Sequence, residues 1–381
     1  MPRRIPQHRL SVVGTRSVTL VAVATFVASL SAVGGPTKAD EPQLRKAEEY
    51  LRVGMLDSAA SVYLGLFRSD ENEEASKLIR EGLSLLIGEP TEHRDAERAF
   101  GRAERRDRSS PWPPYLRGLA LRSNNSRQAR RYFDDSIGRS RRFVPALLAK
   151  ARLEANVKRS ALRSRRAFAA VLGAIPNHPT ATYELGRVYE ILEGDKPRAI
   201  TFYEQHALIN PRFGPNLAEL GIGRVLEGDW RKGRRALYQA LMADGIDDVA
   251  VTMALGISYL GDGQFDQAHE TFSQVMDVMP EEERALYDDI SLIAARREVA
   301  YVARIGGEQR RRFLEKFWTR RDPTPITAAN ERQMEHYRRV WRSKHDYGVA
   351  KSPWDKRGEV YIRYGDPLHK MSSSNPNFKQ P

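Results

Sequence analysis

The amino-acid sequence predicts an all-α repeat solenoid followed by a small α+β segment at the C-terminus. From Glu41 to about Tyr287, apolar residues recur at three- and four-residue steps, the period of an amphipathic helix. Turn-forming residues, among them Asn210-Pro211 and Gly261-Asp262-Gly263, interrupt this pattern at regular intervals. A Leu-Gly pair also recurs at a fixed spacing, at Leu185-Gly186, Leu220-Gly221 and Leu255-Gly256. Fixed recurrence of helix pairs is typical of stacked repeats.

The first 39 residues differ from the rest and are predicted to be a signal peptide. Arg3, Arg4, Arg9 and Arg16 precede an apolar run, and no acidic residue occurs before Asp40. A basic N-terminal region, an apolar stretch and small residues at a cleavage site are typical of an export signal. We expect cleavage before Asp40, with an uncleaved N-terminal anchor as the alternative. The protein would then lie in the periplasm of a bacterium or on the outer face of its membrane.

Composition excludes several kinds of chemistry. The 381 residues include no cysteine, which rules out disulfides, thiolate zinc sites, a cysteine nucleophile and lipidation at cysteine. Apolar residues make up 41% and charged residues 29%, proportions that fit a soluble helical protein. The sequence has no phosphate-binding loop, dinucleotide fingerprint or nucleophile elbow, so we predict no cofactor.

Positive charge is concentrated in one stretch. The net charge is +13, and five basic residues precede Asp40, so the remaining chain has 57 basic and 49 acidic residues. Within residues 102–166 there are 19 basic and five acidic residues. The excess is typical of a solvated helix surface, but such a stretch can also attract anionic lipid or an acidic protein. Export argues against nucleic acid as the partner.

Residues 40–282 are predicted to form about seven helix pairs, of which the last three are the most regular. Gly256 and Ala268 are small, so two helices can approach closely, while Tyr259 and Phe272 fill the space around them. Gly263 permits a turn with positive φ. The copy that begins near Thr180 has one extra residue around 193–196, and the middle copy has Gly245 in place of a proline. These copies resemble tetratricopeptide repeats.

The resemblance implies that the first helix of each pair lines a groove for a peptide or a partner helix. By position, this candidate partner-binding groove would present Tyr183, Glu184, Arg187, Glu190, Ala218, Glu219, Ile222, Met253 and Ile257. The alternative for each residue is ordinary packing between repeats. The groove and its junction with the C-terminal segment form the expected working surface.

After Pro280 the character of the sequence changes. Residues 283–305 are predicted to be a capping helix and linker, with the helix over 287–303. In residues 306–381, Thr327 is the expected cap of a following helix and Arg321 the expected partner of Asp322. Residues 359–364 alternate in polarity and predict a strand, which would need partner strands, so we expect this segment to be incomplete.

The C-terminal segment resembles the GWxTD domain of exported bacterial proteins. The residues that carry the resemblance are Phe317, Trp318, Arg321, Asp322, Pro323, Pro325, Thr327, Asn330, Glu331, Trp354, Arg357, Gly358, Tyr361, Gly365 and Pro367. The glycine, threonine and aspartate that give the domain its name are absent around Trp354. The resemblance implies no established activity.

We predict no catalytic residue and no metal site. Glu331, Glu335, His336 and His345 lie on one expected helix, but their spacing matches no metal-binding helix motif. His336 is expected at the surface. The sequence therefore indicates a non-enzymatic protein-binding scaffold of the bacterial cell envelope. The alternatives are an envelope hydrolase or transferase with its site in 318–367, and an anionic-surface-binding protein that uses residues 102–166.

Overall fold

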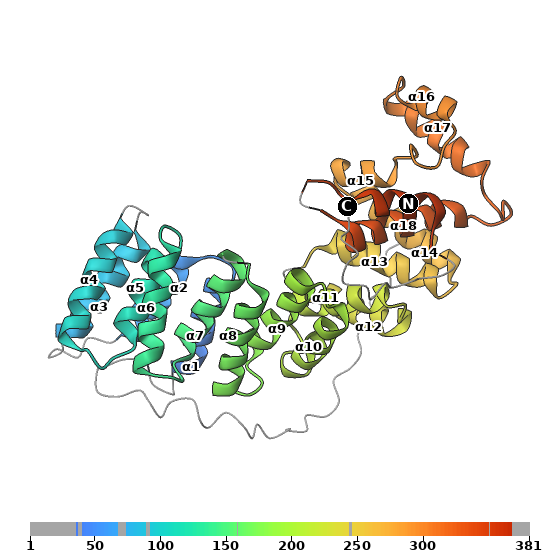
Figure 1. The fold of residues 1–381 in the computed structure, drawn as a ribbon. Helices are drawn as coiled ribbons and strands as arrows, with labels where there is room; N and C mark the ends of the chain where they lie inside the picture. Colours follow the sequence, from blue (N-terminus) through green and yellow to red (C-terminus); the bar gives the residue numbers. More distant parts are fainter. Residues whose placement is uncertain are drawn as a thin grey trace, which may run out of the picture. The chain divides into compact units, whose positions relative to one another are not determined.

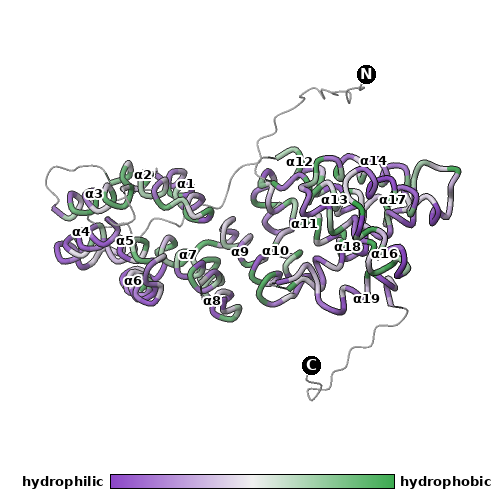
Figure 2. Tube along the Cα trace, turned by 90° about the horizontal axis from the view of Figure 1, so that it is seen from above, coloured by the Kyte–Doolittle hydropathy of each residue, from purple (hydrophilic) through white to green (hydrophobic). Residues whose placement is uncertain are grey.

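The computed structural model describes Pro36 and residues 40–67, 74–88, 92–157, 159–243, 246–349 and 351–367. The predicted signal peptide and Gly245 lie outside these residues. The chain divides after His178 into two compact units. Helices make up both units, and hydrophobic and hydrophilic residues alternate along them as expected for amphipathic helices (Figures 1 and 2). The predicted all-α solenoid is confirmed.

The first unit contains four consecutive helix pairs (Figure 1). In order, they are α1 (Glu41–Arg52) and α2 (Leu56–Leu66), α3 (Glu74–Ile87) and α4 (His93–Arg106), α5 (Trp112–Leu121) and α6 (Ser126–Arg139), and α7 (Val144–Arg152) and α8 (Ala161–Ala174). A short π-helical segment, η3 (Leu153–Val157), extends α7.

The second unit adds three pairs and a C-terminal group of helices. The pairs are α9 (Pro179–Arg187) with α10 (Lys196–Ile209), α11 (Gly214–Leu226) with α12 (Trp230–Leu241), and α13 (Asp248–Gly261) with α14 (Phe265–Val278). The C-terminal helices are α15 (Glu281–Tyr287), α16 (Arg296–Val302), α17 (Gly307–Thr319), α18 (Glu331–Tyr347) and α19 (Lys356–Tyr364). Within the described ranges, the two units therefore hold seven helix pairs.

A glycine on the first helix of a pair faces a large side chain on the second. A Cβ atom added to Gly256 would lie 2.6 Å from the ring of Phe272, and one added to Gly186 would lie 2.6 Å from the ring of Tyr203. Gly118 has the same relation to Phe133, at 2.4 Å. Any side chain at these glycines would push the helices apart. Recurrence of this contact explains the spacing of the Leu-Gly pairs in the sequence.

The repeat that begins near Thr180 has one extra residue, and the end of its first helix is wound as a wider π-helix. The last turns of the first helix form a π-helical segment, η4 (Val188–Glu193), and the Asp195 amide donates to the Tyr189 carbonyl at 2.9 Å. Gly194 follows with φ +69°, and the Asp195 carboxylate accepts from the Arg198 amide at 3.1 Å to cap α10. A π-helical turn absorbs a one-residue insertion without shifting the pairs on either side.

In the first unit, α1 and α2 pack back against α5 and α7. The Tyr63 hydroxyl on α2 is 2.8 Å from the Tyr115 hydroxyl on α5, and both side chains are buried. The ring of Trp112, at the start of α5, contacts those of Phe67 and Phe143 at centroid distances of 5.2 and 4.9 Å. One hydrophobic core therefore joins helices that are not neighbours in sequence.

The expected helix over 287–303 is wrong, because it is interrupted. Helix α15 ends at Tyr287, and the Asp289 carboxylate then accepts from the amide and hydroxyl of Ser291 at 2.8 and 3.0 Å. Such aspartate turns compete with a continuing helix. Helix α18 instead packs against α13, α14 and α15, and Tyr337 contacts the rings of Phe272 on α14 and Tyr287 on α15 at 5.6 and 5.9 Å. It covers the apolar side of the last pair.

The expected strand over 359–364 is also wrong. These residues belong to α19, whose first turn is capped by the Asp355 carboxylate accepting from the Arg357 amide at 2.8 Å. Gly358, Tyr361 and Ile362 are buried, and their three- and four-residue spacing is helical. In the part of the chain that the structure describes there is no strand, only an isolated bridge between Val349 and Ser352. An alternation over six residues was too short to identify a strand.

Candidate functional site

The nine residues predicted to line a groove lie on the first helices of the second unit's pairs, α9 with η4, α11 and α13. Its nine candidate residues fall into two groups by burial. Tyr183, Glu184, Met253 and Ile257 are buried, whereas Arg187, Glu190, Ala218, Glu219 and Ile222 are partly exposed. The structure brings eight of these residues together in two places with different chemistry, whereas Tyr183 packs in a separate cluster with Ala199 and Tyr203.

The first place, which we name the acidic section, consists of Glu184, Arg187, Glu190 and Glu219. Arg187 pairs with Glu184 at 3.6 Å, and the Tyr203 hydroxyl donates to Glu190 at 2.5 Å. Burial raises the pKa of the Glu219 carboxyl to about 7, the Glu190 carboxylate adds to this rise, and Arg187 opposes it. Arg187 therefore interacts with Glu184 and Glu219, whereas the Tyr203 hydroxyl holds Glu190. An added cation would stabilise the ionised form of Glu219.

The second place, the apolar section, consists of Ala218, Ile222, Met253 and Ile257. Its members belong to or pack against the same hydrophobic cluster as Met334, Tyr337, Val340 and Trp341 of α18. Met253 and Ile257 are therefore buried within the chain itself, whereas Ala218 and Ile222 stay partly exposed. At the end of α18, Asp346 forms an ion pair with Lys196 at the start of α10, which fixes the C-terminal helix across the pairs.

The residues of the GWxTD-like motif hold the C-terminal helices together. Phe317 and Trp318 are buried in a cluster with Leu314 and Val302. Tyr361 is buried, and its hydroxyl donates to Asp366 at 3.1 Å. Gly365 has φ +82°, and an added Cβ would lie 2.6 Å from the Arg339 guanidinium. These contacts give the motif residues a structural role in joining α17, α18 and α19.

Three expected details of this segment are wrong. Asn330, not Thr327, caps α18: its side chain accepts from the Gln333 amide at 2.9 Å and donates to the Trp318 carbonyl at 2.8 Å. Arg321 pairs with Glu298 at 3.0 Å rather than with Asp322, which accepts from the Thr324 amide at 2.9 Å. The longer arginine reaches a neighbouring helix, whereas the short aspartate closes its own turn.

Arg338 pairs with Glu335 at 2.6 Å, and Glu331 lies at the helix terminus, in the first turn of α18. His336 is buried rather than exposed, with Nε2 3.1 Å from the Tyr287 carbonyl. Burial lowers the pKa of His336 to about 4, so the ring is neutral at physiological pH. No group of acidic and histidine residues that could hold a metal ion occurs among the described residues.

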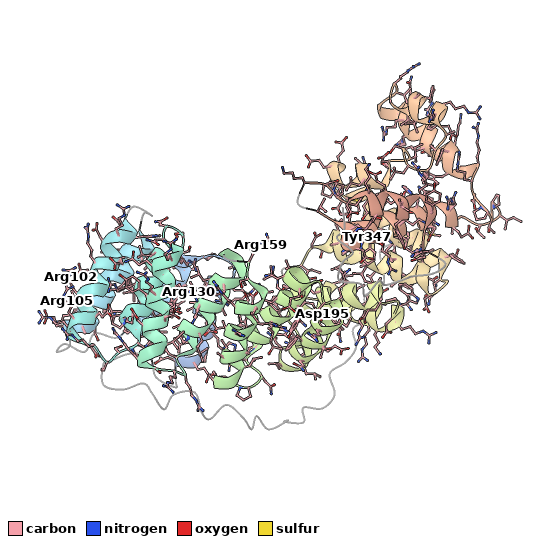
Figure 3. The ribbon with its side chains drawn as sticks, in the orientation of Figure 1. Arg102, Arg105, Arg130, Arg159, Asp195 and Tyr347 are labelled. Atoms are coloured by element: carbon pink, nitrogen blue, oxygen red, sulfur yellow. The ribbon has the colours of Figure 1, made fainter. Side chains whose placement is uncertain are left out.

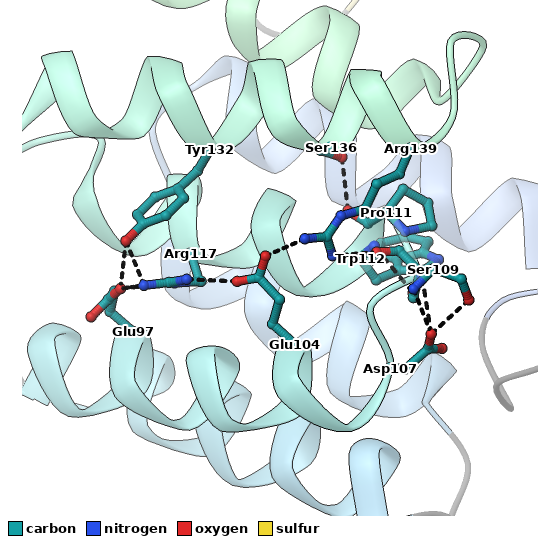
Figure 4. Close-up of polar contacts among 11 residues, drawn as sticks. Glu97, Glu104, Asp107, Ser109, Pro111, Trp112, Arg117, Tyr132, Ser136 and Arg139 are labelled. Carbon is teal, nitrogen blue, oxygen red and sulfur yellow. Dashed lines mark hydrogen bonds and ion pairs between the residues drawn. The ribbon is translucent and has the colours of Figure 1, made fainter.

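Several basic side chains in residues 102–166 form ion pairs with carboxylates. Arg117 on α5 donates to Glu97 at 2.8 Å and to Glu104 at 2.6 Å, both on α4, and Arg139 on α6 also pairs with Glu104 (Figure 4). Arg102 and Arg105 project from the outer side of α4, while Arg130 lies among the helices, 3.0 Å from Glu154 (Figure 3). The stretch therefore contributes to packing as well as to the surface.

Sequence reasoning missed a buried polar cluster in the first unit. Glu48 lies on the buried face of α1, 5% exposed, and its carboxyl is 3.6 Å from the Nε2 atom of His178. Burial raises the pKa of Glu48 to about 7 and lowers that of His178 to about 4. The signal was present in the sequence, because Glu48 interrupts the apolar positions Leu44, Ala47 and Leu51 of α1.

Residues 148–216, from α7 into α11, match a family model. That family is the tetratricopeptide repeat. The match includes two of the described helix pairs and agrees with the predicted tetratricopeptide-like packing. A comparison with curated proteins finds no match.

Three solved structures illustrate what the chain is similar to. YrrB, described as a TPR protein with an unusual peptide-binding site, is 18% identical over 50% of this chain and 97% of its own, with a TM-score of 0.45. MamA from Desulfovibrio magneticus RS-1 is 20% identical over 48% and 94%, with a TM-score of 0.38. PilF from Pseudomonas aeruginosa is 14% identical over 56% and 95%, with a TM-score of 0.47.

Proposed function

We propose that the protein is a non-enzymatic scaffold that binds a protein segment carrying basic side chains through the acidic section of its groove. The observation that carries the proposal is the arrangement of Glu184 and Glu190 on one first helix and of Glu219 on the next, in a tetratricopeptide-like array. In the apolar section beside it, Met253 and Ile257 are buried in one hydrophobic cluster with residues of α18, so the acidic section is the more exposed part of the predicted groove. Helix pairs of this kind present extended binding surfaces.

Peptide binding tests the proposal. We expect an array of 15-residue peptides to show selection for lysine- and arginine-containing sequences over their glutamate-substituted counterparts. Glu219→Gln should weaken binding about tenfold, which is about 1.4 kcal/mol, because it removes one attraction from a partly desolvated site. Binding should also weaken as the pH falls below about 7, where Glu219 becomes protonated.

Glu281→Gln on the exposed start of α15 is the matched control and should bind like the wild type. Equal selection of acidic and basic peptides, or unchanged binding by Glu219→Gln, would show that the acidic section is not the contact surface.

We propose that this scaffold works in the bacterial cell envelope, since residues 1–39 have the pattern of an export signal and the C-terminal segment resembles the GWxTD domain. No helix in the described ranges is long and apolar enough to cross a membrane. Cell fractionation checks the location: the full chain should appear in the periplasm or with the envelope, and removal of residues 2–39 should leave it in the cytoplasm. Retention of the full chain in the cytoplasm would contradict export.

A further inference from the structure

A cavity in the first unit combines positive charge with an apolar wall. Its volume is about 270 Å³, and it lies where α1, α5 and α7 come together. Arg52, Arg122 and Arg152 line it, one from each helix region. None of the described residues that line it is acidic. Three cationic side chains at one half-open cavity repel one another unless anions neutralise them.

The three guanidiniums are not equally neutralised. Arg52 pairs with Glu49, and Arg122 donates to the Gly54 carbonyl at 3.2 Å. The Nε and Nη2 atoms of Arg152 are buried, and neither has a hydrogen-bond partner among the residues that the structure describes. The nearby Glu48 carboxyl offers little compensating charge, because burial raises its pKa to about 7. Arg152 therefore has hydrogen-bonding capacity that the described residues leave unused.

Arg122 and Arg152 also act on each other. Burial lowers the pKa of Arg122, and the charge of Arg152 lowers it further. Two guanidiniums that repel one another at a cavity gain from a shared anion between them. A guanidinium fork matches a carboxylate particularly well, because it can donate two parallel hydrogen bonds.

The rest of the wall is apolar. Leu51, Leu119, Phe133 and Leu153 line the cavity together with the arginines. An inorganic ion would leave this wall uncovered, whereas an apolar body attached to the anion would cover it. The volume is at the lower end for ligand pockets, which restricts the ligand to a small molecule.

We infer that this cavity binds a small organic carboxylate, with the carboxylate on Arg152 and Arg122 and an apolar body against Leu51, Leu119 and Phe133. The site is distinct from the acidic section and has the opposite charge. It lies in the other unit, so the two proposals stand or fall separately.

Calorimetric titration of the full chain with octanoate and benzoate tests the inference. Both should bind, and octanamide and inorganic phosphate should bind at least tenfold more weakly, because the first lacks the charge and the second the apolar body. Arg152→Gln should weaken octanoate binding at least tenfold. Arg166→Gln on the exposed face of α8 is the control and should leave binding unchanged.

A second variant guards against a folding defect in Arg152→Gln. Ala149→Leu fills part of the cavity while keeping all three arginines, and it should also lose octanoate binding. The inference is overturned if neither carboxylate binds at millimolar concentration. It is also overturned if phosphate or octanamide binds as tightly as octanoate, or if folded Arg152→Gln and Ala149→Leu variants both bind like the wild type.

Discussion

Replacing Phe272 by alanine is expected to lower the free energy of unfolding of the second unit by about 3–5 kcal/mol. The Phe272 side chain is only 2% exposed, and its ring occupies the space that a side chain at position 256 would need. Since glycine has no side chain that could move into the gap, the cavity would stay open. The ring also contacts Tyr337 of α18 at 5.6 Å, so the same change loosens the C-terminal helix.

Urea unfolding followed by tryptophan fluorescence measures this loss, because four of the five tryptophans (Trp230, Trp318, Trp341 and Trp354) lie in the second unit. Val278→Ala is the matched control, since Val278 lies on the same helix but is 71% exposed, and it should change stability by less than about 0.5 kcal/mol. Amide exchange in α18 should be faster in Phe272→Ala than in Val278→Ala. A loss below about 1 kcal/mol would show that the glycine-to-ring contact does not hold the pair together.

The repeat architecture could be predicted from the sequence because each pair repeats the same local contact. Gly256 with Phe272 and Gly186 with Tyr203 are separated by 16 and 17 residues, so the pattern is visible within a short window. The π-helical turn η4 appeared in the sequence as one extra residue for the same reason. The glycine-to-ring contacts and the one-residue insertion can therefore be recognised from the spacing of residues within a short stretch of sequence.

The position of α18 could not be predicted in this way. Its contact with α13 and α14 joins residues far apart in sequence, such as Phe272 and Tyr337, and no repeat marks the pairing. The expected capping helix at 287–303 was assigned by proximity along the chain, but the Asp289 turn interrupts that segment. The groove's apolar section was therefore predicted as open surface, although α18 packs with Met253 and Ile257 in one cluster.

The buried polar cluster of the first unit was overlooked for a related reason. Glu48 could be seen as an exception on the apolar face of α1, but its partners His178 and Arg152 lie more than 100 residues away. Only the fold shows that α1 packs against the region of α7, where these groups meet. A lone buried acid in a sequence predicts that a partner exists without saying which residue it is.

The Glu48–His178 pair is expected to make little net contribution to the pH dependence of stability between pH 4.5 and 6.5. In the folded protein the pKa of Glu48 is raised from 4.5 to about 7 and that of His178 is lowered from 6.5 to about 4, in both cases mainly by burial. The charged groups around the pair are Arg45, Arg152 and Glu41. The folded pair therefore holds one proton in this range, on Glu48, and the unfolded pair also holds one, on His178. Because the folded and unfolded pairs bind the same number of protons, the pair makes the free energy of unfolding neither rise nor fall with pH in this range.

Removal of either partner should expose the titration of the other, with opposite signs. In His178→Gln, the raised pKa of Glu48 gives stability that is fully present below pH 4.5 and is lost as the pH rises toward 7. In Glu48→Gln, the lowered pKa of His178 gives stability that is present above pH 6.5 and is lost as the pH falls toward 4. Each change amounts to about 3 kcal/mol, because one pKa unit corresponds to about 1.4 kcal/mol.

Urea unfolding at a series of pH values, followed by hydrogen exchange of α1 and α5, measures both slopes. The exposed Asp135→Asn on α6 should reproduce the wild-type profile and serves as the control. If both variants showed the wild-type pH dependence, the two groups would have to be hydrated in the folded protein and α1 could not be packed against the rest of the unit. Opposite slopes would instead show that burial of α1 is what shifts both pKa values.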